Sequence, residues 1–210
     1  MKLHGFFRSS AAQRVRIALN LKGLKATPVS HHLAKGEHKQ EGYVALNPQG
    51  LVPSLELDDG TVLTQSLAII EWLEETHPKP ALLPADALLR AKIRAFALVV
   101  ACEIHPLQSL GALNRLRKTG LAEDVVKQWA IAINMDGLAA CERLIAKDPG
   151  PFCFGSAPTL ADVFLVPQLG NARRNGADVS GFQRLMQAEA ACKKLDAFAA
   201  AEPERQPDAA

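Results

Sequence analysis

The sequence predicts a small α/β domain followed by an all-helical domain. Three observations support this prediction. Residues 1–77 mix short strand-like runs with helical periodicity, residues 78–86 contain three prolines, and the pattern beyond them is helical. We therefore expect one domain over residues 1–80 and a second over residues 87–210, joined by a proline-rich linker.

The first part of the α/β domain is expected to have the order βαβ. Lys2–Phe7 and Lys25–Ser30 have the short apolar-leaning composition of strands. Between them, Arg14–Lys22 has the apolar spacing of a helix, and Gly23 follows where a helix-terminating glycine belongs.

The second part of this domain is expected to have the order ββα. Asp59-Gly60 is a strong turn signal, and it separates two apolar runs at residues 51–57 and 61–63, so these runs predict a hairpin. Residues 66–77 then form an amphipathic helix by their apolar spacing.

The remaining chain predicts helices and a polar end. Helical periodicity covers residues 87–117, 123–146, 160–175 and 182–199, and residues 202–208 are polar and interrupted by proline.

Composition excludes several classes of partner. Lys and Arg total 24 against 22 Asp and Glu, a net charge of +2, which is too balanced for a protein that mainly binds nucleic acid. No uncharged apolar run reaches the length of a transmembrane helix, and the N-terminal residues do not resemble a secretory signal, so we expect no membrane partner. The cysteines form no CxxC pair and have no metal-ligand spacing, which favours free thiols, a cytoplasmic location and no metal site; they are Cys102, Cys141, Cys153 and Cys192.

Two local features are candidates for ligand binding. Pro53 lies within a strand pattern, where proline either occupies an edge or follows a cis peptide bond that exposes the Val52 backbone to a ligand. Ser66 follows Gln65 at the predicted start of a helix, where it is expected to be the N-cap. The amides behind Ser66 would form an anion site, although a capping serine without a ligand is the commoner explanation of this pattern taken alone.

Together, four segments resemble the glutathione transferase family. Residues 47–53, NPQGLVP, are similar to the loop that leads into the family's cis-proline. Residues 65–71, QSLAIIE, are similar to the motif that binds the γ-glutamyl carboxylate of glutathione. Residues 80–84, PALLP, match the linker, and residues 158–162, PTLAD, form a Thr-x-x-Asp capping box. The resemblance implies the glutathione transferase fold, with a thioredoxin-like first domain, and a glutathione site formed by Gln49, Val52, Pro53, Gln65 and Ser66.

The first turn indicates the subclass. Residues 7–19, FRSSAAQRVRIAL, resemble the zeta-class signature RSSCSxRVRIAL. Tyr43 is the single tyrosine, which excludes a tyrosine-type transferase, and no cysteine precedes Cys102, which argues against glutaredoxin-like chemistry. A serine type remains. Ala11 stands where the signature has cysteine.

The serine type assigns a catalytic role to Ser9 or Ser10. A thiol with a pKa of about 8.5 is about 3% ionised at pH 7, so a hydroxyl donor and a helix N-terminus that stabilise the thiolate would raise its reactivity. Ser10 and Gln13 have the spacing of a capping box, which predicts that Ser10 caps the helix and that Ser9 binds the glutathione thiolate.

The resemblance also assigns residues of the helical domain. The segment from Ile104 to Gln108 resembles one that contacts glutathione, which points to His105 and Gln108. Arg174 corresponds to an arginine that the family places near an acidic substrate, and Arg8 is its counterpart in the first domain.

The implied activity is cis–trans isomerisation of maleylacetoacetate to fumarylacetoacetate in aromatic amino acid catabolism, by a homodimer that uses glutathione as a cofactor. Maleylpyruvate isomerisation in the gentisate pathway uses the same chemistry and is the second hypothesis. Residues 107–111 lack the arginine expected of those bacterial enzymes, which favours maleylacetoacetate. Two further hypotheses are a general transferase that acts on small α-halo acids and a noncatalytic glutathione-binding module.

Overall fold

The computed structural model describes residues 1–209. The chain divides into two compact units. The first contains residues 1–81 together with the segment from Lys194 onward, and the second contains Leu82–Lys193.

A mixed four-stranded sheet is the centre of the first unit. The sheet order is β2-β1-β3-β4. β1 pairs in parallel with β2 and antiparallel with β3, while β3 and β4 form an antiparallel hairpin. The parallel pair needs a crossover, which α1 provides. The strands are β1 (Lys2–Gly5), β2 (Thr27–Ser30), β3 (Ser54–Glu56) and β4 (Val62–Thr64).

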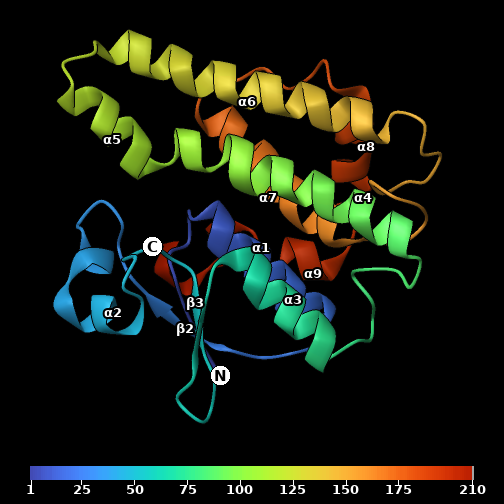
Figure 1. Ribbon diagram of the computed structural model, residues 1–210, viewed down its shortest axis with the longest axis horizontal. Coiled ribbons are helices and arrows are strands. Elements are labelled where there is room, and N and C mark those ends of the chain that lie inside the picture. The colour runs from blue at the N-terminus through green and yellow to red at the C-terminus, as the bar shows by residue number, and fades with distance from the viewer. Residues whose placement is uncertain (210) are drawn as a thin grey trace. The chain divides into compact units, whose positions relative to one another are not determined.

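Helices cover both faces of this sheet. α1 (Ser10–Leu21) and α3 (Ser66–Thr76) pack together on one side, and α2 (Glu41–Leu46) lies on the other (Figure 1). A short 3-10 helix, Glu37–Lys39, precedes α2. The apolar core between α1, α3 and the sheet includes the buried side chains Val15, Ile17, Leu55, Ile69 and Leu73. The βαβ and ββα orders are therefore confirmed, with α2 as an element that the sequence pattern did not predict.

The two predicted glycine turns are present. Gly23 follows α1 with φ +66, and the amides of Gly23 and Leu24 donate to the carbonyls of Asn20 and Leu19, which is a Schellman arrangement. Gly60 has φ +86 in the turn between β3 and β4, as the Asp-Gly signal predicted.

The C-terminal segment belongs to the first unit. It contains α9 (Asp196–Ala199) and two 3-10 helices, Pro203–Arg205 and Pro207–Ala209. Asn20 Nδ2 donates to the Ala197 carbonyl at 3.0 Å, and Phe198 is buried. This grouping differs from the expected second domain of residues 87–210, because contacts with α1 rather than helical pattern decide where the segment packs.

The second unit contains the remaining helices. α4 (Ala87–Leu98) continues into a π-helical segment (Val99–Ile104) and a 3-10 turn (Pro106–Gln108) before α5 (Leu110–Lys118). The prediction of one helix over residues 87–117 was wrong, because Pro106 lacks the amide that an uninterrupted helix requires. Ser109 then caps α5 by accepting from the Ala112 amide at 3.3 Å.

α6 (Glu123–Ile145), α7 (Leu160–Arg174) and α8 (Gln183–Cys192) complete this unit. α8 ends at Cys192, so the single helix predicted over residues 182–199 was wrong; α8 and α9 are separate helices in different units. α7 is its most buried helix and packs against α4, α6 and α8. The predicted capping box at its start is confirmed, with the Thr159 amide donating to Asp162 Oδ2 at 2.8 Å.

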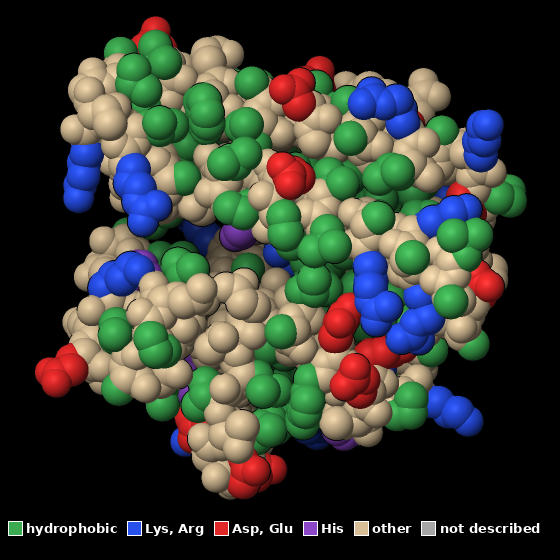
Figure 2. Space-filling view, in the orientation of Figure 1, with side chains coloured by type: hydrophobic (Ala, Val, Ile, Leu, Met, Phe, Trp, Pro, Cys, Tyr) green, Lys and Arg blue, Asp and Glu red, His purple; other side chains and the backbone are tan. Residues whose placement is uncertain are grey.

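Two further properties concern the apolar and charged side chains of the described residues. Among residues 1–209, no helix combines the length and apolar character needed to cross a membrane. Basic and acidic side chains are interspersed on the face drawn in Figure 2, in keeping with the small net charge.

Candidate functional site

Ser9 is the N-cap of α1. Its backbone is extended (φ −68, ψ 112), and its Oγ accepts from the Ala12 amide at 3.2 Å. Ser10 is already the first helical residue and is only 3% exposed, so the prediction that Ser10 caps the helix was wrong by one residue. An accepting hydroxyl keeps its proton, so the half-exposed Ser9 can still donate to a ligand anion.

The start of α3 lacks a side-chain cap. Gln65 occupies the N-cap position with φ +66 and ψ 119, and Ser66 is the first helical residue rather than the expected cap. A positive φ in a residue other than glycine costs about 1–3 kcal/mol and is concentrated at functional sites. The first amides of α3 have no acceptor within the helix, so this end suits an anion.

Arg14 adds a buried positive charge behind Ser66. Its Nη1 donates to Ser66 Oγ at 3.4 Å, and the residue is 2% exposed. Burial lowers the pKa of Arg14 to about 9, which still leaves the guanidinium protonated at neutral pH. Arg14 was not among the predicted site residues. The signal that could have found it was a charge on the face of α1 that also carries the buried Ala11 and Ala18.

The loop before β3 contains the cis peptide bond that the strand proline allowed. The Val52–Pro53 bond is cis. The preceding carbonyl, of Leu51, accepts from the Tyr43 hydroxyl at 2.6 Å and from Asn47 Nδ2 at 2.7 Å. Tyr43 and Asn47 are buried, so they fix the loop from inside; neither was predicted to belong to the site.

Two of the expected ligand contacts lie beside each other at the surface. Gln65 Nε2 donates to Gln49 Oε1 at 2.7 Å, and both residues are exposed. The carboxamides of this pair keep hydrogen-bonding capacity for a ligand.

The first unit therefore fits a peptide-like anion that carries a thiol. It offers an uncapped helix start for a carboxylate, exposed carboxamides for amide groups, and a serine hydroxyl at a second helix start for a thiolate. Glutathione has all three groups.

Three of the four cysteines do not suit a nucleophilic role. Burial raises the pKa of Cys141 to about 12 and raises the pKa values of Cys153 and Cys192 as well, which keeps these thiols protonated. Cys102 is exposed and lies in the second unit. The three buried thiols therefore do not supply a thiolate, whereas glutathione carries one.

In the second unit, Gln108 presents a buried donor. It is 3% exposed, and its Oε1 accepts from Asn175 Nδ2 at 2.7 Å. Asn175 Nδ2 also donates to Asn171 Oδ1 at 3.1 Å. Asn175 thus sets the amide orientation, and Gln108 Nε2 is a buried donor that has no hydrogen-bond partner within residues 1–209. His105 lies half-buried before the same 3-10 turn.

The two adjacent arginines at the end of α7 have different surroundings. Arg173 makes a bidentate pair with the buried Glu189, at 2.7 and 2.6 Å. Arg174 is exposed, and its Nη1 lies beside Gly170. Arg173 is thus committed to a structural pair, and the assignment of Arg174 to the substrate stays a prediction.

Arg8, the expected substrate residue of the first unit, is also exposed. Its guanidinium carbon lies 5.3 Å from the centre of the Phe7 ring. A cation that stacks on an aromatic face remains free to pair with carboxylates at its edge.

Comparisons with known proteins agree with this geometry. Residues 8–76 match the family model of the glutathione S-transferase N-terminal domain, and residues 111–201 match that of the C-terminal domain. The chain is 49% identical to the maleylacetoacetate isomerase of Pseudomonas aeruginosa, with 99% of this chain and 98% of the relative covered. It is 48% identical to the maleylpyruvate isomerase of a Ralstonia species, with both chains fully covered.

Solved structures give the same result. The holo structure of a maleylpyruvate isomerase, a bacterial zeta-class glutathione S-transferase, superposes with a TM-score of 0.97 at 48% identity over the full length of both chains. A maleylacetoacetate isomerase from Methylobacterium extorquens AM1 with bound malonate and GSH superposes with a TM-score of 0.96 at 38% identity, also over both full lengths.

The fold and these matches define a glutathione transferase. The chain belongs to the zeta class of that family, the group that includes the maleylacetoacetate and maleylpyruvate isomerases.

Proposed function

We propose that the protein is a glutathione-dependent cis–trans isomerase that converts maleylacetoacetate to fumarylacetoacetate. The observation that carries this proposal is the start of α3, where Gln65 has positive φ and no side chain caps the helix, beside the buried Arg14. A helix start that is left open and strained at a cost in stability suits the carboxylate of a bound cofactor.

The site residues of the first unit contact different groups of glutathione. The Ser66 end of α3 holds the γ-glutamyl carboxylate, and Gln65 and Gln49 bind its amide groups. Val52, before the cis-proline Pro53, offers its peptide group to the ligand backbone. Glutathione supplies a thiolate that adds reversibly to the conjugated alkene, so that the carbon–carbon bond can rotate.

Ser9 and the arginines act on the reacting groups. The Ser9 hydroxyl donates to the thiolate, and with the N-terminus of α1 it lowers the thiol pKa. Ser10, which is buried, is the less suitable donor. Arg8 and Arg174 bind the substrate carboxylates by charge-assisted hydrogen bonds, and Gln108, with His105 beside it, is assigned to glutathione.

A second candidate substrate is maleylpyruvate. It is favoured by the similarity to the Ralstonia enzyme and by the TM-score of 0.97. The absence of an arginine in residues 107–111 favours maleylacetoacetate instead. Displacement of halide from small α-halo acids is a compatible side activity, because the same thiolate and carboxylate contacts serve it.

We further propose a homodimer that acts in the cytoplasm, in aromatic amino acid catabolism. The similarity to maleylacetoacetate isomerases and the absence of cysteine pairing among residues 1–209 support these assignments.

Side-by-side assays of the two maleyl substrates test the substrate assignment. With glutathione present, we expect kcat/KM for maleylacetoacetate to exceed that for maleylpyruvate. The reverse ratio would assign the gentisate pathway, and no turnover of either substrate by a protein that binds glutathione would indicate a noncatalytic binding module.

A further inference from the structure

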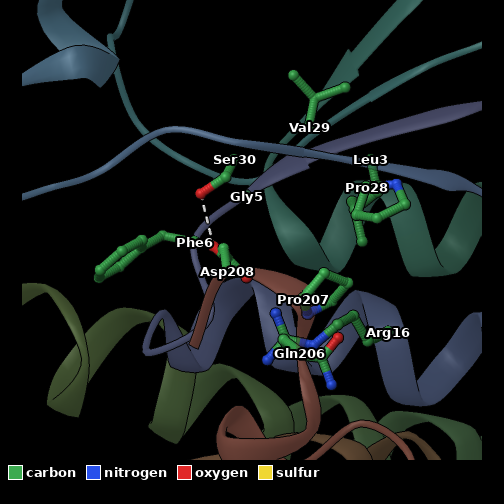
Figure 3. Close-up of a pocket in the computed structure, with 10 residues that line it drawn as sticks. All are labelled: Leu3, Gly5, Phe6, Arg16, Pro28, Val29, Ser30, Gln206, Pro207 and Asp208. Atoms are coloured by element: carbon green, nitrogen blue, oxygen red, sulfur yellow. Dashed lines mark hydrogen bonds between the residues drawn. The ribbon is translucent and has the colours of Figure 1, made fainter. Parts of the chain in front are cut away.

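The C-terminal segment reaches the loop that precedes α1. Oδ2 of Asp208 accepts from the Phe7 amide at 3.0 Å and from the Ser30 hydroxyl at 2.6 Å. Figure 3 shows the Ser30–Asp208 bond at the ends of β1 and β2. Residues 7 and 208 are thus joined by a direct hydrogen bond immediately before Arg8 and Ser9.

Arg16 binds the backbone carbonyl of Phe7. Its Nη2 donates to the Phe7 carbonyl at 3.0 Å and to the Ala201 carbonyl at 3.3 Å. Burial lowers the pKa of Arg16 to about 10, and the charge of Asp208 opposes this shift, so the guanidinium stays protonated at neutral pH. Both polar groups of Phe7 are therefore bound, one by Asp208 and one by Arg16.

A cavity of about 180 Å³ lies between this segment and the sheet. Leu3, Pro28, Val29 and Pro207 are among its lining residues, and Figure 3 shows them around it. The hydrogen bonds of Asp208 hold the end of the segment beside this cavity.

The loop from Phe6 to Ser9 is short and has one internal backbone hydrogen bond, from the Ser9 amide to the Phe6 carbonyl at 2.9 Å. Ser9 follows Phe7 by two residues, so a change in the position of the Phe7 peptide group moves the Ser9 hydroxyl. A misplacement of a catalytic group by about 1 Å costs about 100-fold in rate, so such a loop benefits from an external anchor.

We propose that Asp208 is a positioning residue for this reaction: its carboxylate fixes the Phe7 peptide group and thereby places Arg8 and Ser9 against substrate and thiolate. The inference deepens the proposed function and rests on it. Asp208 acts on the thiolate through the hydrogen bonds that its carboxylate accepts, which fix the position of the Phe7 backbone.

Three variants test this assignment. Asp208→Ala removes the acceptor. Asp208→Asn keeps it, because the single oxygen that accepts both bonds can be replaced by an amide oxygen. Glu204→Ala removes an exposed acid of the same segment and is the matched control. The measurements are kcat/KM for maleylacetoacetate, the pKa of the bound glutathione thiol from thiolate absorbance, and Tm.

We expect Asp208→Ala to lower kcat/KM about tenfold and to raise the pKa of the bound thiol, with Asp208→Asn and Glu204→Ala close to the wild-type protein. Equal loss in Asp208→Asn and Asp208→Ala, or a fall in Tm with an unchanged thiol pKa, would overturn the inference, as would wild-type behaviour of Asp208→Ala.

Measurements on the wild-type protein distinguish failure of the proposed isomerase function from failure of the role proposed for Asp208. Absence of isomerisation by a wild-type protein that still binds glutathione would refute the proposed function. The thiol pKa of bound glutathione would then decide the role of Asp208 alone, because that measurement needs no substrate.

Discussion

α7 and α3 begin in opposite ways. At α7, Thr159 and Asp162 form a reciprocal capping box in a fully buried setting. At α3, Gln65 has positive φ, no side chain caps the helix, and the residue is exposed. A helix start that is satisfied by its own side chains contributes to folding, whereas one that is left open keeps its amides for a ligand.

The start of α1 combines features of the starts of α7 and α3. Ser9 caps the helix through its oxygen and keeps its hydroxyl proton for another acceptor. One residue can thus serve the fold and the chemistry together. Substitutions at each of the three helix starts separate these contributions.

The largest effect is expected at α7. Asp162 accepts from the amides of Thr159 and Cys153 and from the Thr159 hydroxyl, so Asp162→Ala leaves several buried donors unsatisfied. We expect the free energy of unfolding to fall by about 3–5 kcal/mol, measured by urea denaturation. Glutathione affinity of the folded fraction should remain unchanged; a large loss of affinity would contradict a purely structural role.

Asp162 is also expected to make the free energy of unfolding depend on pH. Burial raises its pKa despite the hydrogen bonds it accepts. Because the pKa of Asp162 is higher in the folded state than in the unfolded state, its contribution to the free energy of unfolding is fully present below the usual pKa of aspartate. This contribution is lost as the pH rises through the folded-state pKa. Denaturation of Asp162→Asn across that range should lack this dependence.

The next largest effect is expected at α1. Ser9→Ala should lower turnover by about two to three orders of magnitude, because one donor to an anion is lost. It should also cost about 1 kcal/mol of stability through the lost cap, a cost that the corrected capping assignment moves from Ser10 to Ser9. Ser10→Ala is the matched control, and a greater loss of turnover in that variant would reverse the two serines.

Substrate charge gives the third test. Arg174→Ala should raise KM for a maleyl diacid about 10- to 150-fold, the loss of a charge-assisted contact, while the kinetics with an uncharged aryl halide stay nearly constant. Arg115, which is exposed on α5, provides the control; Arg173 does not, since it pairs with Glu189. Equal damage with both substrates would assign Arg174 to the fold or to glutathione.

The smallest effect is expected at α3. Ser66→Ala removes the hydroxyl that accepts from Arg14 and should raise the glutathione Kd about tenfold, with a much smaller fall in Tm than Asp162→Ala causes. Calorimetry measures both quantities. An unchanged Kd would show that this helix start is not the carboxylate site.

How much the sequence predicted depends on how local each determinant is. The capping box at α7 and the turns at Gly23 and Gly60 depend on four to six neighbouring residues, and all were predicted. Ser9 and Ser10 are both good caps, and the path of the chain, which no local pattern specifies, selects Ser9.

Long-range contacts could not be predicted. Asp208 binds the Phe7 amide across almost the whole length of the chain, and Arg14 reaches Ser66 from another helix. Periodicity carries no information about such partners. The same limit explains why the C-terminal segment was assigned to the helical domain although it packs in the first unit.

The central claim is that glutathione is used catalytically to isomerise a maleyl diacid. The most direct measurement mixes the wild-type protein with excess maleylacetoacetate and a small amount of glutathione, and follows the fumaryl product and the free thiol together. We expect complete conversion with the thiol unchanged at the end, and no conversion without glutathione. Stoichiometric loss of thiol, or equal conversion in its absence, would contradict the catalytic use of glutathione.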